Sequence, residues 1–424
     1  TGIDGLILPD LPLPIYQKEY QEMVEEADLR FIMLITPQTS EERIHTISEL
    51  SGGKGFLYMV ADSATTGARK EINKAQIEIP PRFADVPPVN PRDRARVGGG
   101  GSWSGATGLA ADVDYFGEWV CDQTFERIGH LYPKCNGETV IAWLWARTVK
   151  CPNPACGARM PLLSRYHLCT KKGKKVWVEP RINKRDKTVR FELHGGKGSP
   201  PKPPKVGRGA EFRCLVCGEV ASGDYIKAAG LADHSKDQLI GIVTEGPNGR
   251  NYHAPSPEHE TVAKRAEPEW TPDLEMSTHP QYMAPPRYGM ITFADLFTDR
   301  QLVALTTLSD LVSQVHDVVL EQAKATGMPD DSVPLREGGA GAKAYAEAVS
   351  FYLGVNVGRQ ANRLSTLCFW DSGGQKVQQV FSRQALTMNW NYTEANPFSD
   401  SSGNFLGQLH YLLSVFKAIP KSEC

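Results

Sequence analysis

The chain has 424 residues, of which 41% are hydrophobic, and it carries a formal net charge of −2. Its length predicts two to four domains, and no apolar run reaches the roughly 18 residues of a membrane span, so we expect no membrane association. Nine cysteines do not form an even disulfide framework, which favours a reducing, cytoplasmic location. Because residue 1 is threonine and no signal peptide follows, we expect a fragment.

The first seventy residues alternate between apolar runs and helical patterns. The apolar runs are Gly5–Asp10, Phe31–Ile35 and Gly55–Val60. Between them, 15–26 and 40–50 have the spacing of amphipathic helices. Short, continuously apolar strands that alternate with helices are typical of parallel βα units.

Three stretches of this region, "GIDGLILPDLPL", "FIMLITPQTSEERI" and "GFLYMVADSATTGAR", resemble consecutive parts of the tryptophan synthase alpha chain. That family is a (β/α)₈-barrel lyase of tryptophan biosynthesis, which converts indole-3-glycerol phosphate to indole and glyceraldehyde 3-phosphate. The resemblance covers residues 1–69. It implies that Tyr58 lines the substrate pocket, that Thr66 and Gly67 belong to a mobile loop, and that a tryptophan synthase beta chain is the partner. A barrel needs eight strands, and the family's catalytic carboxylates have no counterpart here, so we expect no lyase activity from this chain alone.

Two cysteine pairs lie in the middle of the chain, each followed directly by glycine. They are Cys151-Pro-Asn-Pro-Ala-Cys156-Gly and Cys214-Leu-Val-Cys217-Gly. Four thiolates suit a tetrahedral zinc ion, and the glycine permits the tight turn that aims backbone amides at the sulfurs. The alternative is four buried free cysteines in a core. We expect Zn²⁺ bound by Cys151, Cys156, Cys214 and Cys217.

Positive charge is concentrated between the two cysteine pairs. From Arg165 to Arg213 there are 15 Lys and Arg residues against 4 Asp and Glu. Two β-rich segments, 175–180 and 188–194, predict a hairpin in this region. Such cations can bind phosphates, and Trp177 and Phe191 could stack on unpaired bases; the alternative is a solvated basic face. The candidate DNA-binding residues are Lys171, Lys172, Lys174, Lys175, Arg181, Lys184 and Arg185.

The remainder of the chain resembles the middle of large adenine-specific DNA methylases that contain a zinc ribbon. The resemblance is carried by "INKAQIEIPPRFADVPPVNP", "GLAADVDYFGEWV", "WLWARTVKCPNPACGARMPL" and "SRQALTMNWNYTEANPFSDSSGNFLG", among other stretches. It implies methyl transfer from S-adenosylmethionine to adenine. The family's S-adenosylmethionine loop and its Asp-Pro-Pro-Tyr motif are absent from this chain, so we expect neither S-adenosylmethionine binding nor catalysis.

Three helices are predicted after the zinc ribbon, and we interpret them as scaffold. Thr298 and Gln301 form a capping box that opens the first helix. The second is expected from Ala342 to Leu367, and the third from Asn404 to Ala418. We expect the histidines near the ribbon, including His253 and His259, to lie on the surface.

These observations predict a mixed α/β chain with five segments. The segments are an incomplete (β/α)₈-barrel fragment at 1–69, a linker at 70–110, a zinc ribbon with an inserted basic hairpin at 111–253, an irregular linker at 254–290 and a methylase-like helical scaffold at 291–424. Three hypotheses follow: a zinc-bearing DNA-binding segment of a methyltransferase without its catalytic core, a lyase of the alpha-chain class, or a chimera of two gene fragments without a joint function.

Overall fold

The computed structural model describes most of the chain after residue 82 and short segments before it. The described residues are 5–7, 16–26, 30–32, 34–35, 58–59, 83–95, 103–232, 236–247, 249–279, 282–381 and 385–416. The chain divides into two compact units. Unit 1 comprises Thr1–Ala84, Ser104–Ala106 and Val415–Cys424, and unit 2 comprises Asp85–Trp103 and Thr107–Ser414.

Unit 1 contains two pairs of parallel strands. Strand β1 (Gly5–Ile7) pairs with β2 (Arg30–Ile32), and β3 (Leu34–Ile35) pairs with β4 (Tyr58–Met59). The chain between β1 and β2 forms a π-helical turn over Tyr16–Tyr20 and the short helix α2 (Gln21–Glu26). The predicted parallel pairing is therefore confirmed for these strands. No closed barrel is present among the described residues, and the helix expected over 40–50 lies outside them.

Unit 2 is built on an antiparallel sheet in the order β14-β13-β5-β17. Its strands are β5 (Val140–Lys150), β13 (Lys236–Gly246), β14 (Gly249–His253) and β17 (Asn391–Ala395), and β6 (Arg159–Pro161) pairs with the end of β5. The side chains of β5 are buried from its first residue to its tenth, on both faces. This explains why its first seven residues, 140–146, are all apolar or aromatic and do not alternate with polar ones.

Smaller sheets accompany the main one. The predicted hairpin is confirmed: β8 (Lys174–Asn183) pairs with β9 (Thr188–Gly195), and β7 (His167–Lys171) pairs with the other edge of β8. The remaining strands are β10 (Lys205–Val206), β11 (Glu211–Arg213) and β12 (Val220–Ala221), which form one sheet, and β15 (Trp370–Asp371) and β16 (Lys376–Val377), which form another.

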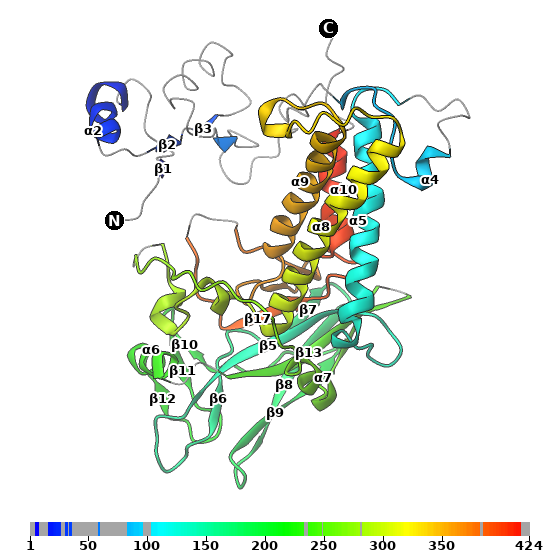
Figure 1. Cartoon of the computed structure of the whole chain (residues 1–424). Coiled ribbons are helices and arrows are strands. Elements are labelled where there is room, and N and C mark those ends of the chain that lie inside the picture. The colour runs from blue at the N-terminus through cyan, green and yellow to red at the C-terminus, as the bar shows by residue number, and fades with distance from the viewer. Residues whose placement is uncertain are drawn as a thin grey trace. The chain divides into compact units, whose positions relative to one another are not determined.

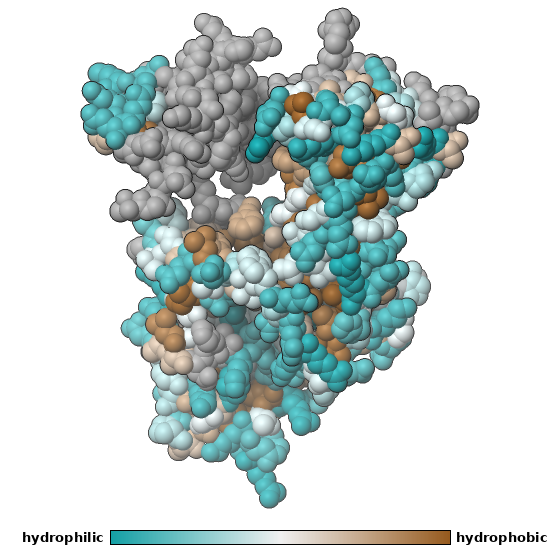
Figure 2. All heavy atoms as spheres, in the orientation of Figure 1, coloured by the Kyte–Doolittle hydropathy of each residue, from teal (hydrophilic) through white to brown (hydrophobic). Residues whose placement is uncertain are grey.

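Four long helices lie alongside one another next to the main sheet (Figure 1). They are α5 (Thr107–Ile128), α8 (Asp299–Ala325), α9 (Ala342–Ala361) and α10 (Phe405–Phe416). Thr298 and Gln301 form the expected capping box of α8. Hydrophilic residues cover most of the described surface in the view of Figure 2. No helix in the described part of the chain combines the length and apolar character needed to cross a membrane.

One sequence prediction about a helix needs correction. Helix α9 ends at Ala361 and not at Leu367, because the Asn362 carbonyl and side chain accept hydrogen bonds from the backbone amides of Val380 and Phe381. The segment expected to be irregular at 254–290 contains α7 and one 3₁₀ turn, and its other described residues are mostly without regular secondary structure. The short helical elements of unit 2 are α4 (Pro91–Arg94), α6 (Gly223–Ala232), α7 (Pro257–Ala263) and 3₁₀ turns at Gly129–Leu131, Pro285–Tyr288, Phe293–Leu296 and Leu335–Glu337.

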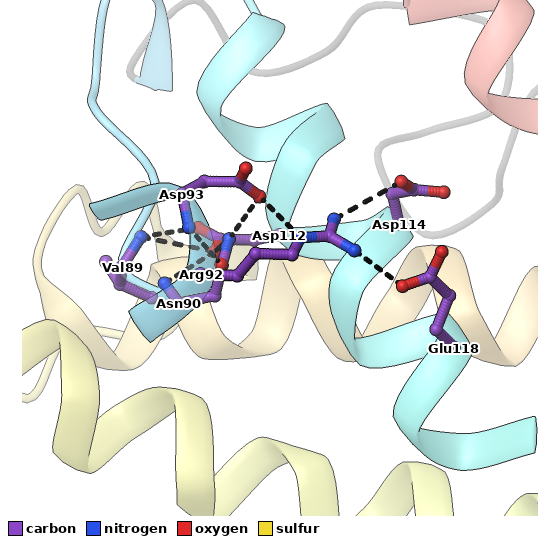
Figure 3. Close-up of polar contacts among 7 residues, drawn as sticks. All are labelled: Val89, Asn90, Arg92, Asp93, Asp112, Asp114 and Glu118. Carbon is purple, nitrogen blue, oxygen red and sulfur yellow. Dashed lines mark hydrogen bonds and ion pairs between the residues drawn. The ribbon is translucent and has the colours of Figure 1, made fainter. Parts of the chain in front are cut away.

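Asp112 on α5 fixes the segment that leads into α4 (Figure 3). Its buried carboxylate accepts hydrogen bonds from the backbone amides of Val89 and Asn90, from the Asn90 side chain and from the Tyr345 hydroxyl. Burial raises the pKa of Asp112, while these donors oppose that shift. Arg92 on α4 reaches the exposed side of α5, where it pairs with Glu118 at 2.5 Å.

A buried ion pair joins the helices to the sheet. Arg300 on α8 donates to Glu394 on β17 at 2.7 and 2.9 Å, and both side chains are at most 2% exposed. Trp145 and Thr298 also donate to this carboxylate, each at 2.9 Å. The Arg300 guanidinium lies 4.0 Å from the centre of the Trp143 ring, a cation–π contact.

Candidate metal centre and basic hairpin

The two cysteine pairs occupy two turns at the same end of unit 2. The first lies between β5 and β6, and the second between β11 and β12. Gly157 and Gly218, which follow the pairs, have φ angles of +58° and +85°. Only glycine adopts this left-handed conformation without strain. The Gly157 amide donates to the Asn153 carbonyl at 3.0 Å, and the Gly218 amide donates to the Cys214 carbonyl at 2.9 Å, so each loop closes tightly.

The turns bring all four sulfur atoms together, as the sequence predicts. The ligand atoms of Cys151, Cys156, Cys214 and Cys217 lie within 4.8 Å of one another. The Sγ atoms of Cys151 and Cys217 are 3.5 Å apart, and those of Cys156 and Cys214 are 3.9 Å apart. A tetrahedron with Zn–S bonds of about 2.3 Å has sulfur–sulfur edges of roughly 3.8 Å. The four residues therefore fit a zinc ion.

Backbone amides point at these sulfurs. The amides of Val216 and Cys217 donate to the Cys214 sulfur, which lowers the pKa of this thiol, although burial has the larger effect and raises it. Burial also raises the pKa of Cys151, whereas the amide of Glu219 lowers that of exposed Cys217. Amide donors of this kind stabilise thiolates, which are the form that binds zinc.

An aromatic cluster supports the second turn. Phe212 on β11 is fully buried, and its ring meets that of Trp390 edge to face at 5.3 Å between centroids. The Tyr288 ring also meets that of Trp390 edge to face, with 4.9 Å between the centroids. Four protein ligands on a rigid support leave no open coordination position, so the centre suits a structural and not a catalytic metal.

The nearby histidines stay outside the cluster. His259 is buried and accepts a hydrogen bond from Trp143 Nε1 at 2.9 Å, so the expectation that it lies on the surface is wrong. The indole needs a partner when it is buried, which explains the position of this imidazole. His253 lies at the end of β14, and its Nε2 atom is 3.4 Å from the Glu138 carboxylate.

The predicted DNA-binding residues are all exposed, but the structure divides them into two groups. Lys171, Lys172, Lys174 and Lys175 surround the β7–β8 turn, which we call the lysine turn. The other end of β8 and the β8–β9 turn carry Arg181, Lys184 and Arg185. We call this end of the hairpin, from residue 181 to residue 188, the hairpin tip. A strand of ten residues separates the two ends by roughly 30 Å. The seven cations therefore do not form one patch.

The hairpin tip contacts the first cysteine turn. The Lys187 ammonium group donates to the Ala155 carbonyl at 2.8 Å, one residue before Cys156. The sequence does not indicate this contact, because Lys187 and Ala155 are 32 residues apart. At the base of the tip, Arg181 is paired with Glu192 at 2.6 Å, which neutralises part of its charge.

The proposed stacking residues are not available to a ligand. Trp177 is 6% exposed and Phe191 is 4% exposed, and both belong to the main hydrophobic core. The expectation that they stack on unpaired bases is therefore wrong. Aromatic residues in a hairpin are more often core residues than ligand contacts, because one face of such a sheet packs on the rest of the protein.

The candidate residues of unit 1 are described only in part. Tyr58 lies on β4, paired with Leu34, and Thr66 and Gly67 lie outside the described residues.

Comparison with known proteins concerns the N-terminal part of the chain. The family model of the tryptophan synthase alpha chain matches residues 1–82. The tryptophan synthase alpha chain of Phocaeicola vulgatus is 52% identical over 92 residues, which cover 22% of this chain and 35% of that protein. That of Christiangramia forsetii is 47% identical over 91 residues, which cover 19% of this chain and 35% of that protein. That of Parabacteroides distasonis is 45% identical over 92 residues, which cover 22% of this chain and 35% of that protein.

The chain thus spans about a third of the length of these curated relatives. No solved structure gives a significant match. The region that holds the four-cysteine cluster lies outside the matched residues. The N-terminal segment is therefore similar to the tryptophan synthase alpha chain: the family model ends at residue 82, and the alignments with these relatives cover 19–22% of the chain.

Proposed function

We propose that residues 111–253 form a zinc-stabilised module that binds DNA through the phosphate backbone. The observation that carries the proposal is the contact between Lys187 and Ala155, which ties the hairpin tip to the loop of the four-cysteine cluster. A bound zinc ion would fix this loop and thereby the position of Lys184 and Arg185. Cations held in place bind phosphates with less loss of side-chain entropy than free ones.

The choice of DNA rests on the resemblance to zinc-ribbon adenine-specific DNA methylases. In that context the module would act as a DNA-binding insertion of a methyltransferase whose S-adenosylmethionine loop and catalytic motif lie outside this sequence. Because Trp177 and Phe191 are buried, base stacking contributes nothing to this proposal. Binding is then dominated by charge and depends steeply on salt.

Zinc content is the first test. We expect one zinc ion per purified chain by mass spectrometry, and strong thiolate-to-metal absorption after substitution with cobalt. Cys214→Ser should abolish both signals, because only three of the thiolates remain. Cys121→Ser is the matched control, since Cys121 is also a buried free cysteine but lies on α5 outside the cluster. Equal metal loss in both variants would contradict the assigned ligands.

DNA binding is the second test, measured by fluorescence anisotropy of a labelled duplex across a salt series. The double variant Lys184→Ala/Arg185→Ala should reduce the slope of log K against log salt by about 2, because each phosphate contact contributes about 0.9. The control Lys324→Ala/Lys343→Ala removes the same charge from α8 and α9 and should leave the slope unchanged. Identical slopes for both variants, or no binding by the unmodified chain, refute the proposal.

The family match of residues 1–82 supports a second candidate, which concerns unit 1 alone. We propose that this segment derives from a tryptophan synthase alpha chain and has no lyase activity in this chain, with or without a tryptophan synthase beta chain. The matched relatives are about three times longer than the matching region. Release of indole from indole-3-glycerol phosphate by the purified chain would contradict this.

A further inference from the structure

A polar pocket of about 750 Å³ lies beside the loop between β17 and α10, entirely within unit 2. Its walls come from β14 and from three parts of the C-terminal region: the segment after α9, β16 with the residues that follow it, and the loop Phe398–Asn404 with α10. The volume lies in the range typical of small-molecule sites. It is separate from the four-cysteine cluster, since no cysteine ligand lines it.

Three cations line this pocket against one carboxylate. They are Arg250, Arg363 and Lys376, and the carboxylate is that of Asp400. Lys376 makes no close salt bridge among the residues that the structure describes, although its charge is one of the influences that lower the pKa of nearby Asp371, after the hydrogen bond from the Gly374 amide. The excess of positive charge in a concave site attracts anions, because low-dielectric walls concentrate the field.

The arginines are positioned by contacts that leave capacity for a ligand. Arg363 donates to the Val377 carbonyl at 2.8 Å and to the Gln379 side chain at 3.4 Å, both uncharged acceptors. Its Nε group is buried without a hydrogen-bond partner. Arg250 donates to the Ser401 hydroxyl at 2.7 Å, although its charge is shared with Glu245 at 2.7 Å.

The loop that forms the floor of the pocket is held from below by α9. Gln360 donates to the Gly403 carbonyl at 2.8 Å, and Asn356 donates to the Phe405 carbonyl at 3.2 Å. Both side chains are fully buried. Gly403 has a φ angle of +104°, which other residues rarely adopt. The loop is therefore built in one conformation before any ligand arrives, which lowers the entropy cost of binding.

An aromatic side chain completes the site. Tyr411 on α10 lines the pocket and is 67% exposed, so its ring is accessible to a flat ligand group. Arginine recognises phosphate through parallel N–H bonds, and an exposed aromatic ring stacks on a nucleobase. We infer that this pocket binds the phosphate group of a nucleotide, with Arg363 and Lys376 as the main phosphate contacts and Tyr411 against the base.

The inference does not depend on the proposed function of the zinc module. The two regions do adjoin, since the Lys174 side chain in the lysine turn donates to the Arg250 carbonyl at 2.6 Å. The phosphate could therefore belong to a free nucleotide or to the end of a DNA strand. These sources share the same chemistry and are separated by experiment.

Isothermal titration of the full chain with inorganic pyrophosphate tests the phosphate site, at constant ionic strength and without DNA. We expect one binding site per chain and at least a ten-fold weaker affinity for Lys376→Gln. The matched control is Lys343→Gln, which removes the same charge at the opposite end of α9. Arg363→Gln should also weaken the binding of pyrophosphate. If that variant fails to fold, Lys376→Gln still tests the site, because Lys376 is more exposed than Arg363 and its replacement disturbs the fold less.

Competition assigns the source of the phosphate. Displacement of pyrophosphate by ADP, weakened by Tyr411→Ala, supports a free nucleotide. Displacement by a 5′-phosphorylated single strand, but not by the same strand without phosphate, supports a strand end. No binding of pyrophosphate, or equal loss of affinity in Lys376→Gln and Lys343→Gln, overturns the inference. The Lys184→Ala/Arg185→Ala variant should bind pyrophosphate normally, so failure of DNA binding and failure of this pocket are distinguishable.

Discussion

Loss of the negative charge of Glu394 should destabilise unit 2 strongly. In Glu394→Gln the Arg300 guanidinium, which is fully buried, keeps its charge and loses its counter-ion. Two unit charges about 4 Å apart interact by about 4 kcal/mol at an effective dielectric constant of 20, and removing one partner of a buried pair typically costs about 3–5 kcal/mol. We therefore expect the free energy of unfolding to fall by about 3–5 kcal/mol.

Urea unfolding followed by tryptophan fluorescence measures this change. All eight tryptophans lie between residues 103 and 390, inside unit 2, so the signal reports this unit alone. The control is Glu337→Gln, an exposed carboxylate beside Arg336, which should leave the unfolding curve unchanged.

The double variant Arg300→Met/Glu394→Gln isolates the coupling between the two charges. Its loss of unfolding free energy should be clearly smaller than the sum of the losses in the single variants Arg300→Met and Glu394→Gln, because no charge is left buried and unpaired. The reasoning is refuted if Glu394→Gln costs less than about 1 kcal/mol, or if the two single losses simply add.

Two further predictions concern unit 2. Burial raises the pKa of Asp237, so its carboxyl group binds a proton more tightly in the folded than in the unfolded state. The free energy of unfolding therefore falls as the pH rises from about 4, the ordinary pKa of aspartate, through the raised pKa of the folded state. Asp237→Asn, which can keep the hydrogen bond from Tyr392, should therefore be more stable than the parent at pH 7 and lose this advantage below pH 4 in urea titrations. Gly230→Ala should lower the midpoint of thermal unfolding, because its Cβ would overlap the Tyr288 carbonyl, at 2.8 Å from the carbonyl carbon; a midpoint at or above that of the parent would show that α6 can shift without cost.

The sequence predicts the metal ligands because their signal is local. In each pair the spacing of the cysteines and the glycine that follows specify one tight turn, and both turns occur as expected. The hairpin of β8 and β9 and the capping box at Thr298 were predictable for the same reason, since neighbouring residues carry the information. What the spacing did not reveal is that the second turn rests on Trp390, which is far away in sequence.

The arrangement of the cations cannot be predicted from local sequence. A count of charges treats 165–213 as one basic region, whereas the extended backbone of β8 carries the lysine turn and the hairpin tip to opposite ends of a strand. Trp177 and Phe191 seemed suitable for stacking by type, yet their faces are covered by the core. Burial depends on which element packs on which face, and a single strand does not specify this.

The linear order of residues thus determined the turns that gather the four thiols, the strands that flank them and the start of α8, since backbone preferences and capping act over a few positions. Only the tertiary structure brought Arg250, Arg363 and Lys376 to one pocket and enclosed Arg300 with Glu394. Arg250 precedes Arg363 and Lys376 by more than a hundred residues, and Arg300 lies 94 residues before Glu394. Their meeting depends on strand order and helix packing, which create the low-dielectric surroundings that give such charges their effect.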